Sequence, residues 1–243
     1  MTYDEIFGRL SLDALPFTAF IKDPSVNEGV ANAAASLVVI GAAAVLFLLT
    51  KYRLWGPLWR DWLTSTDHKK IGIMYIVFAL VMLTRGVIEG VVMRTQQAFG
   101  LDGGFLQPDH FAQLFSTHGT IMIFFMAMPF MTGLINIIMP LQIGTRDVAY
   151  PLLNSISFWL TASGAGLVLI SLVIGKFSTA GWTGYPPYSG VEFTPGVGVD
   201  YWIWAVLISG VGTTMSGINF VVTIIISWTN SRSISNYESI TVT

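Results

Sequence analysis

Five long apolar stretches constrain the fold of this chain more than any other feature of its sequence. A helix that crosses a bilayer needs about 20 mainly apolar residues, and each stretch reaches that length. We predict membrane-spanning helices at residues 30–49, 71–93, 114–139, 152–175 and 202–228. The stretches lack the alternation of apolar and polar residues that marks barrel strands. The sequence therefore predicts an all-α integral membrane protein with a bundle of five transmembrane helices.

The composition excludes several other classes of protein. Hydrophobic residues make up 53% of the 243 residues and charged residues only 11%, whereas ordinary soluble chains carry roughly 25% charged residues. So few charges cannot cover a water-facing surface, which excludes a soluble globule. A net charge of -2 gives no basic surface for nucleic acid. The absence of cysteine excludes a disulfide scaffold, a thiolate metal site and a cysteine nucleophile.

The distribution of Lys and Arg predicts the orientation, because cytoplasmic segments carry an excess of these residues. Seven lie on one side of the predicted spans: Lys51, Arg53, Arg60, Lys69, Lys70, Arg146 and Arg232. Four lie on the other: Arg9, Lys22, Arg94 and Lys176. We expect the N-terminus outside, in the periplasm, and the C-terminus in the cytoplasm. Trp55, Trp59 and Trp62, between the first two spans, are typical of a membrane interface.

Two polar segments interrupt or follow the spans. Residues 176–201 are rich in Gly, Pro and aromatic residues, which predicts a long loop rather than a helix, packed over the outer membrane face. Residues 229–243 are rich in Ser, Thr and Asn without periodicity. We expect them to form an unstructured, non-native tail after a membrane domain over residues 1–228.

Arg85 and Glu89 are the ionisable pair inside the second span. Charged residues within a span are costly and are functional hypotheses by default. Four residues apart, the two side chains share a helix face and can pair. Gly86 and Gly90 flank this turn and allow close approach of a helix or a ligand. Two interpretations are open: a charge pair of purely structural use, or a polar site for a membrane-soluble ligand such as a quinone head group.

His118 lies near the outer end of the third span. A neutral imidazole nitrogen can ligate haem iron axially, and Gly119 beside it would leave room for a flat macrocycle. A hydrogen-bonded contact between helices is the alternative. His110 and Gln113, just before the same span, are expected at the level of Arg85 and Glu89 if the two helices pack antiparallel.

Asp147 lies in the short connection between the third and fourth spans, and Asn136 and Asn154 lie on the flanking helix ends. A carboxylate followed by amides leading inward can begin a proton relay. The alternative is a solvated loop charge with helix-capping asparagines. His68, in the sequence STDHKK, reads as part of the basic interfacial segment.

Seven motifs occur in order along the chain: GRLSLDALPF, DWLTSTDHKKIGIMYI, RGVIEGVVMRTQQA, THGTIMIFFMAMPF, PLQIGTRDVAYPLLN, GWTGYPPYSG and PGVGVDYWIW. In this order and spacing they resemble subunit I of a haem-copper respiratory oxidase, specifically of a cytochrome bo-type ubiquinol oxidase. The resemblance extends from about residue 7 to residue 225, nearly the whole chain. It implies the first part of a membrane fold with twelve or more helices, in a bacterial inner membrane.

The resemblance implies a role for most of the polar residues above. His118 matches an axial ligand of the low-spin haem, and Arg94 a residue near that haem's propionates. Arg85, His110 and Gln113 match residues of the ubiquinol site. Glu89 stands where the bo-type enzymes carry aspartate. Asp147, Asn136 and Asn154 match residues at the mouth of the family's proton-uptake channel.

The resemblance also implies what the chain lacks. The second axial histidine, the ligand of the oxygen-reducing haem and the copper ligands belong to later parts of the family's subunit I, and the chain has three histidines in all. We expect a truncated or frame-shifted product that is inactive alone. In the complete enzyme it would oxidise ubiquinol, reduce oxygen and pump protons with subunits II, III and IV. A proton-coupled transporter or channel, or an inert remnant, is the alternative.

Overall fold

The computed structural model describes residues 29–99, 104–174 and 176–241, and every described element is helical. In chain order the helices are α3 (Gly29–Lys51), α4 (Trp55–Pro57), η2 (Leu58–Leu63), α5 (His68–Phe99), α6 (Pro108–Thr120), η4 (Ile121–Ala127), α7 (Met128–Gln142), α8 (Pro151–Ile174) and α9 (Gly198–Thr241). The predicted all-α membrane fold is confirmed. Arg9, Lys22 and the first of the seven motifs lie outside the described residues.

Four helices are long and apolar enough to cross a membrane. They cover residues 68–99, 108–142, 151–171 and 198–229. These ranges contain the predicted spans 71–93, 114–139 and 202–228, and most of the span predicted at 152–175. The first predicted span is helical as α3, and its stretch Val39–Lys51 forms a fifth candidate together with Trp55–Leu63, to which it is bent by 103°. Trp55, Trp59 and Trp62 are exposed on this second arm.

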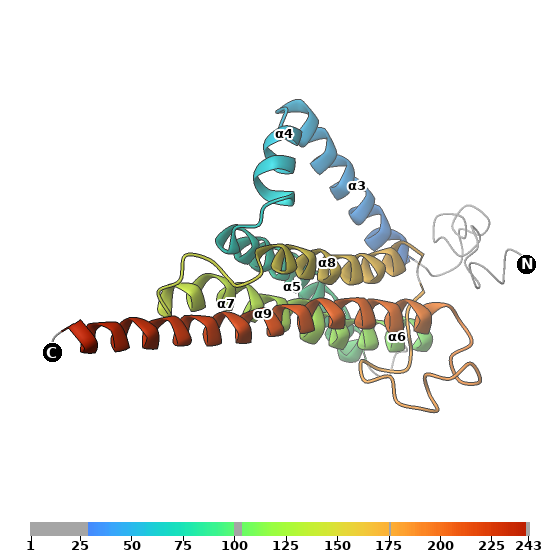
Figure 1. The fold of residues 1–243 in the computed structure, drawn as a ribbon. Coiled ribbons are helices and arrows are strands. Elements are labelled where there is room, and N and C mark those ends of the chain that lie inside the picture. Colours follow the sequence, from blue (N-terminus) through green and yellow to red (C-terminus); the bar gives the residue numbers. More distant parts are fainter. Residues whose placement is uncertain (1–28, 100–103, 175, 242–243) are drawn as a thin grey trace, which may run out of the picture.

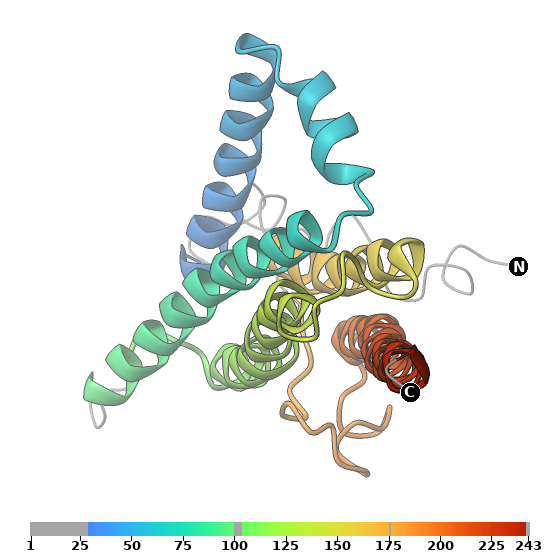
Figure 2. The same ribbon diagram turned by 60° about the vertical axis from the view of Figure 1, so that its left-hand side comes forward.

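Helices α5 to α9 pack into one bundle, and α3 with α4 and η2 forms a V that stands off from it (Figure 1). The view turned by 60° shows the same V rising above α5 and α8 (Figure 2). The second arm is fastened to the bundle where the indole N–H of Trp159 donates to the Leu63 carbonyl at 3.0 Å.

The third span is a continuous helical rod with a change of register. Pro108 begins α6, where its missing N–H costs nothing. Residues Ile121–Ala127 then adopt π-helical hydrogen bonding directly before Pro129. Proline cannot donate to the carbonyl one turn earlier, so a widened turn at this point is the local response to its ring.

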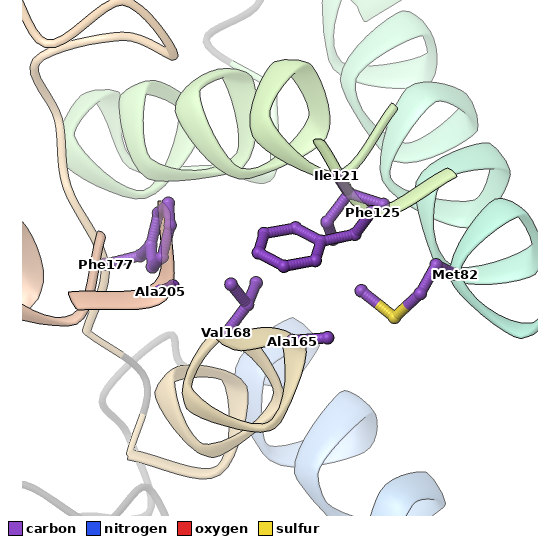
Figure 3. Packing of buried hydrophobic residues seen from close by; sticks show 7 residues of the cluster. All are labelled: Met82, Ile121, Phe125, Ala165, Val168, Phe177 and Ala205. Atoms are coloured by element: carbon purple, nitrogen blue, oxygen red, sulfur yellow. The ribbon is translucent and has the colours of Figure 1, made fainter. Parts of the chain in front are cut away.

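The main hydrophobic core draws one or two side chains from each of several elements (Figure 3). It contains Met82 of α5, Ile121 and Phe125 of η4, Ala165 and Val168 of α8, Phe177 of the following loop and Ala205 of α9. Small residues bring the helix backbones together around this core. A Cβ on Gly133 would lie 2.8 Å from the Gly72 carbonyl, and one on Gly164 2.5 Å from the Ala205 carbonyl. A Cβ on Gly212 would likewise lie 2.7 Å from the Ser157 carbonyl, so α8 and α9 approach closely at both glycines.

The two polar segments have different outcomes. The loop prediction is confirmed, since residues 176–197 form turns and bends without a helix. The prediction of an unstructured tail is wrong, because α9 continues to Thr241 and extends past the rest of the bundle (Figure 1). Its 44 residues span about 66 Å, roughly twice the hydrocarbon thickness. The polar composition that argued against order does not prevent a helix from propagating beyond an apolar, packed segment.

Candidate functional site

The predicted Arg85–Glu89 pair forms on α5. The Arg85 Nε–H donates to Glu89 Oε1 at 3.0 Å, and the two side chains are 12% and 6% exposed. A second nitrogen of the guanidinium, Nη1, donates to the Val168 carbonyl of α8 at 2.9 Å. The pair therefore also ties α5 to α8. Glu89 Oε2 is buried and has no hydrogen-bond partner among the residues that the structure describes.

The two glycines of this turn let α6 and η4 approach α5. A Cβ on Gly86 would lie 2.6 Å from the Met122 sulfur, and one on Gly90 would lie 3.3 Å from His118 Cε1. The close approach predicted from Gly86 and Gly90 is thus made by the helices α6 and η4. His118 lies beside the same α5 turn that carries the ion pair.

His118 is half-buried, and its Nδ1–H donates to the Gly86 carbonyl at 2.8 Å. This bond fixes the orientation of the ring and its tautomer, leaving the lone pair on Nε2. Within the described ranges, no hydrogen bond engages Nε2. The interpretation of His118 as a hydrogen-bonded contact between helices is confirmed. The same geometry also fits an axial haem ligand that acts through Nε2.

The expectation that Gly119 leaves room for a macrocycle is wrong. A Cβ on Gly119 would lie 2.8 Å from Trp182 Cδ1, so the indole of the long loop occupies that space. The sequence could not show this, because Trp182 lies 63 positions away on a loop without periodicity.

Antiparallel packing of α5 and α6 is confirmed by the contact of His118 with Gly86 and by Gln96, whose side-chain oxygen accepts from the Leu106 amide at 2.9 Å. Gln113 lies five residues from His118, about 7.5 Å along the helix, and His110 about 12 Å. The Gln113 amide is engaged elsewhere: Nε2 donates to Asp109 Oδ2 at 2.9 Å, and Oε1 accepts from the Phe177 amide at 3.1 Å.

Arg94 lies exposed near the end of α5. Its Nη1 donates to Gln97 Oε1 at 2.8 Å. The exposed side chain is thus at the same end of the bundle as His110 and Gln113.

A second polar cluster lies at the opposite end of α5. His68 Nδ1 donates to Asp147 Oδ1 at 3.1 Å, and Asn154 Nδ2 donates to Asn136 Oδ1 at 2.6 Å. The structure brings both asparagines together, as expected for a relay leading inward from Asp147. His68, which the sequence assigned to the membrane surface, is instead 2% exposed.

Three hydroxyl groups continue this cluster into the bundle. The Tyr75 hydroxyl lies 3.2 Å from Ser157 Oγ, which accepts from Ser216 Oγ at 2.8 Å and donates to the Asn154 carbonyl at 2.7 Å. Tyr75, Ser157 and Ser216 are buried. Sequence reasoning missed this cluster, and the one available signal was the presence of several hydroxyl residues within apolar spans.

The Arg85–Glu89 pair and the cluster around His68 and Asp147 lie towards opposite ends of the bundle. His68 and Glu89 are 21 positions apart on α5, which is about 31 Å of helix rise and matches the thickness of the bilayer core. No group of three or more His, Asp or Glu residues able to hold a metal ion occurs in the described part of the chain.

Comparison with known proteins gives a consistent result. The family described as "Cytochrome C and Quinol oxidase polypeptide I" matches residues 70–241. The chain is 54% identical over 222 residues to "Ubiquinol oxidase subunit 1" of Acetobacter aceti, and 50% identical over 222 residues to "Cytochrome bo(3) ubiquinol oxidase subunit 1" of Buchnera aphidicola subsp. Schizaphis graminum. It is 48% identical over 221 residues to "Probable cytochrome c oxidase subunit 1" of Bradyrhizobium diazoefficiens. Each alignment covers 90% of this chain and 32% of the relative, so the chain spans about a third of the length of these curated relatives.

Proposed function

Because this chain belongs to the cytochrome c and quinol oxidase polypeptide I family, we propose that it forms the quinol-binding and low-spin haem region of a respiratory quinol oxidase. The observation that carries the proposal is the contact of His118, on α6, with the Gly86 carbonyl of the α5 turn that holds the buried Arg85–Glu89 pair. This turn would bring an electron donor and a haem ligand together inside the membrane.

Glu89 would accept a hydrogen bond from a quinol hydroxyl. Its Oε2 is buried and unsatisfied within the described residues, and an unpaired buried carboxylate oxygen is unfavourable. A hydroxyl donor therefore stabilises this site. Arg85, anchored to the Val168 carbonyl, holds Glu89 Oε1 and orients the carboxylate. His110 and Gln113 would border the same site from α6.

His118 would ligate a low-spin haem through Nε2, with its ring held by the Gly86 carbonyl. Arg94 would neutralise a propionate from the end of α5. A haem held by these residues would supply one-electron redox chemistry between the quinol and an oxygen-reducing haem-copper centre. The ligands for that centre and the second axial ligand would come from outside this chain, since the chain has three histidines in all.

Asp147 would receive protons on the cytoplasmic side and pass them towards Asn136 and Asn154. The hydrogen bond between the two asparagines and the contact of Asp147 with His68 support this route. Lys69, Lys70 and Arg146 lie at the same end of the bundle, as the positive-inside rule requires for a cytoplasmic face. The N-terminus would then be periplasmic, and subunits II, III and IV would be the partners of the complete enzyme.

One relative bears the name of a cytochrome c oxidase, so the electron donor needs an argument of its own. A quinol dissolves in the bilayer, whereas cytochrome c is a water-soluble protein. The ion pair is buried within a span of the bundle, which favours a membrane-soluble donor. Family membership favours an oxidase over a proton-coupled transporter.

The test uses the chain in lipid nanodiscs with decylubiquinol as the probe. Glu89→Gln should weaken binding about tenfold or more, because a charge-assisted hydrogen bond is replaced by a weaker one. Glu192→Gln, at an exposed loop glutamate, is the matched control and should leave affinity unchanged. Equal affinity of Glu89→Gln and the parent chain would refute the assignment of this site.

A second test addresses the haem. Haem added to the chain should give a reduced-minus-oxidised absorption band that His118→Ala removes and His110→Ala retains. A band that survives His118→Ala would exclude this residue as the ligand. We also expect no oxygen consumption by the chain alone with reduced quinol, above a haem-free control.

A further inference from the structure

The second arm of the V, formed by α4 and η2, contains no buried residue. Its tryptophans Trp55, Trp59 and Trp62 recur at intervals of four and three positions, which places them on one face of the helix. They are 47%, 63% and 37% exposed. Tryptophan is enriched where a membrane meets water, because its ring is apolar and its N–H is polar. This face of the arm therefore has the composition of a membrane interface.

The opposite side of the arm is basic. The Arg60 guanidinium lies back over the preceding turn, since a Cβ built on Gly56 would lie 3.4 Å from Arg60 Nη2. Arg60 thus points towards the corner of the V, where Lys51 and Arg53 are also exposed. Within the described residues, none of these three cations forms an ion pair with a carboxylate. Asp61 is the one acidic residue of the arm, so the corner carries an uncompensated positive charge.

The corner holds the arm at a large angle to α3. Arg53 has a left-handed φ of 53°, a conformation that ends an α-helix. The indole N–H of Trp55 donates to Thr50 Oγ1 across the corner at 3.1 Å, and the two arms differ in direction by 103°. At the far end, the Trp159 indole donates to the Leu63 carbonyl. The arm is therefore fixed at both of its ends.

The arm runs across the direction of the membrane-spanning helices. Both views show it crossing the direction of α8 rather than following it (Figures 1 and 2). Residues 55–63 rise only about 13 Å, which is less than half of the hydrocarbon thickness. Entry into the hydrocarbon would also bury Arg60 and Asp61, which is costly for charged side chains. The arm therefore lies along the membrane surface, where the indoles reach the acyl chains and the cations reach the headgroups.

We propose that residues 51–63 form an interfacial anchor that binds an anionic phospholipid, with Lys51, Arg53 and Arg60 at its headgroup and the three indoles beside its acyl chains. Guanidinium groups bind phosphate through paired N–H···O bonds. A zwitterionic headgroup brings its own cation, so the excess positive charge of the corner favours a lipid with net negative charge. A soluble phosphate compound would satisfy the cations and leave the indoles uncovered, which favours a lipid as the occupant. Neither haem nor quinol enters this site.

Native mass spectrometry of the chain, released from micelles with equal amounts of phosphatidylglycerol and phosphatidylcholine, tests the choice of lipid. The parent chain should retain phosphatidylglycerol over phosphatidylcholine about tenfold or more, because each cation near the headgroups adds to the attraction. Lys51→Gln and Arg60→Gln should each lower this ratio by about threefold to fivefold. Arg53→Asn should do the same, since asparagine accepts the left-handed backbone without the charge.

Two control variants separate a site from general surface charge. Arg146→Gln removes the same charge from an exposed loop at the same end of the bundle and should leave the lipid ratio unchanged. Arg60→Lys keeps the charge and should hold the ratio within about twofold of the parent. Helical circular dichroism at the level of the parent chain shows that each variant is folded. An equal ratio in Arg60→Gln and Arg146→Gln, or equal retention of the two lipids by the parent chain, would overturn the proposal.

Trp59→Gln and a soluble competitor distinguish a lipid from a free anion. Loss of the most exposed indole should weaken retention of both lipids by about threefold or more, because this ring contacts acyl chains under any headgroup. Glycerol 3-phosphate in excess should leave bound phosphatidylglycerol in place. Displacement of the lipid by glycerol 3-phosphate, together with unchanged retention in Trp59→Gln, would show that the corner binds free phosphate groups and would overturn the lipid anchor.

Discussion

Replacing Glu89 by leucine should lower the free energy of unfolding by about 3–5 kcal/mol, because Arg85 would keep a charge in a buried position. The Arg85 side chain is 12% exposed, and the carboxylate at 3.0 Å is its charged partner. The Val168 carbonyl at 2.9 Å would remain, but a neutral acceptor does not compensate a full charge.

Arg85→Leu should cost less, about 1–3 kcal/mol. A carboxyl group can take up a proton and become neutral, whereas a guanidinium cannot lose one in a protein. The double replacement should be close to neutral, because it removes both buried charges and leaves apolar side chains of suitable size. The coupling energy of the double-mutant cycle should therefore exceed about 2 kcal/mol.

The assay is equilibrium unfolding of the chain in mixed micelles, followed by helical circular dichroism. Arg94 and Gln97 form a matched, exposed pair at 2.8 Å on the same helix, and leucine there should change stability by less than about 1 kcal/mol. A coupling energy of the Arg85–Glu89 cycle below about 0.5 kcal/mol would refute the reasoning, since it would mean that solvent screens the pair.

Two further predictions concern packing and buried amides. Gly133→Ala places a Cβ 2.8 Å from a backbone carbonyl of α5 and should lower the thermal midpoint, costing about 1–3 kcal/mol. Gly166→Ala, whose added Cβ meets nothing within 4 Å, should instead stabilise the chain by about 0.5–1 kcal/mol through helix propensity. An equal loss of stability in both variants would argue against a tight helix crossing at Gly133. Asn154→Leu removes the donor to the buried Asn136 oxygen and should lower the free energy of unfolding by about 1–3 kcal/mol in chemical denaturation. An unchanged free energy of unfolding would show that water donates to this oxygen instead.

Much of the helical framework was predictable because a bilayer leaves few alternatives. Backbone polar groups must be satisfied within each span, so apolar length alone located the helices that contain residues 71–93, 114–139 and 202–228, and most of residues 152–175. The same argument failed for residues 229–241, which are polar and nevertheless continue the helix.

Part of the candidate site was also local enough to predict. Arg85 and Glu89 pair because four positions on one helix bring side chains together. The contact of His68 with Asp147 joins residues 79 positions apart, and the Tyr75 cluster joins residues of α5, α8 and α9. No sequence periodicity relates such positions, so their meeting depends on how the helices pack.

The sequence by itself determined that this chain is a helical membrane protein, where its spans lie and which charges are buried in them, since hydropathy and helical spacing act over short distances. The tertiary structure decided which side chains share a site. It placed His118 of α6 against the α5 turn of the ion pair, filled the space beside Gly119 with the Trp182 indole, and brought Gln113 into contact with a loop. Each of these contacts joins residues far apart in the sequence, and only the packing of whole helices and the loop brings them within bonding distance.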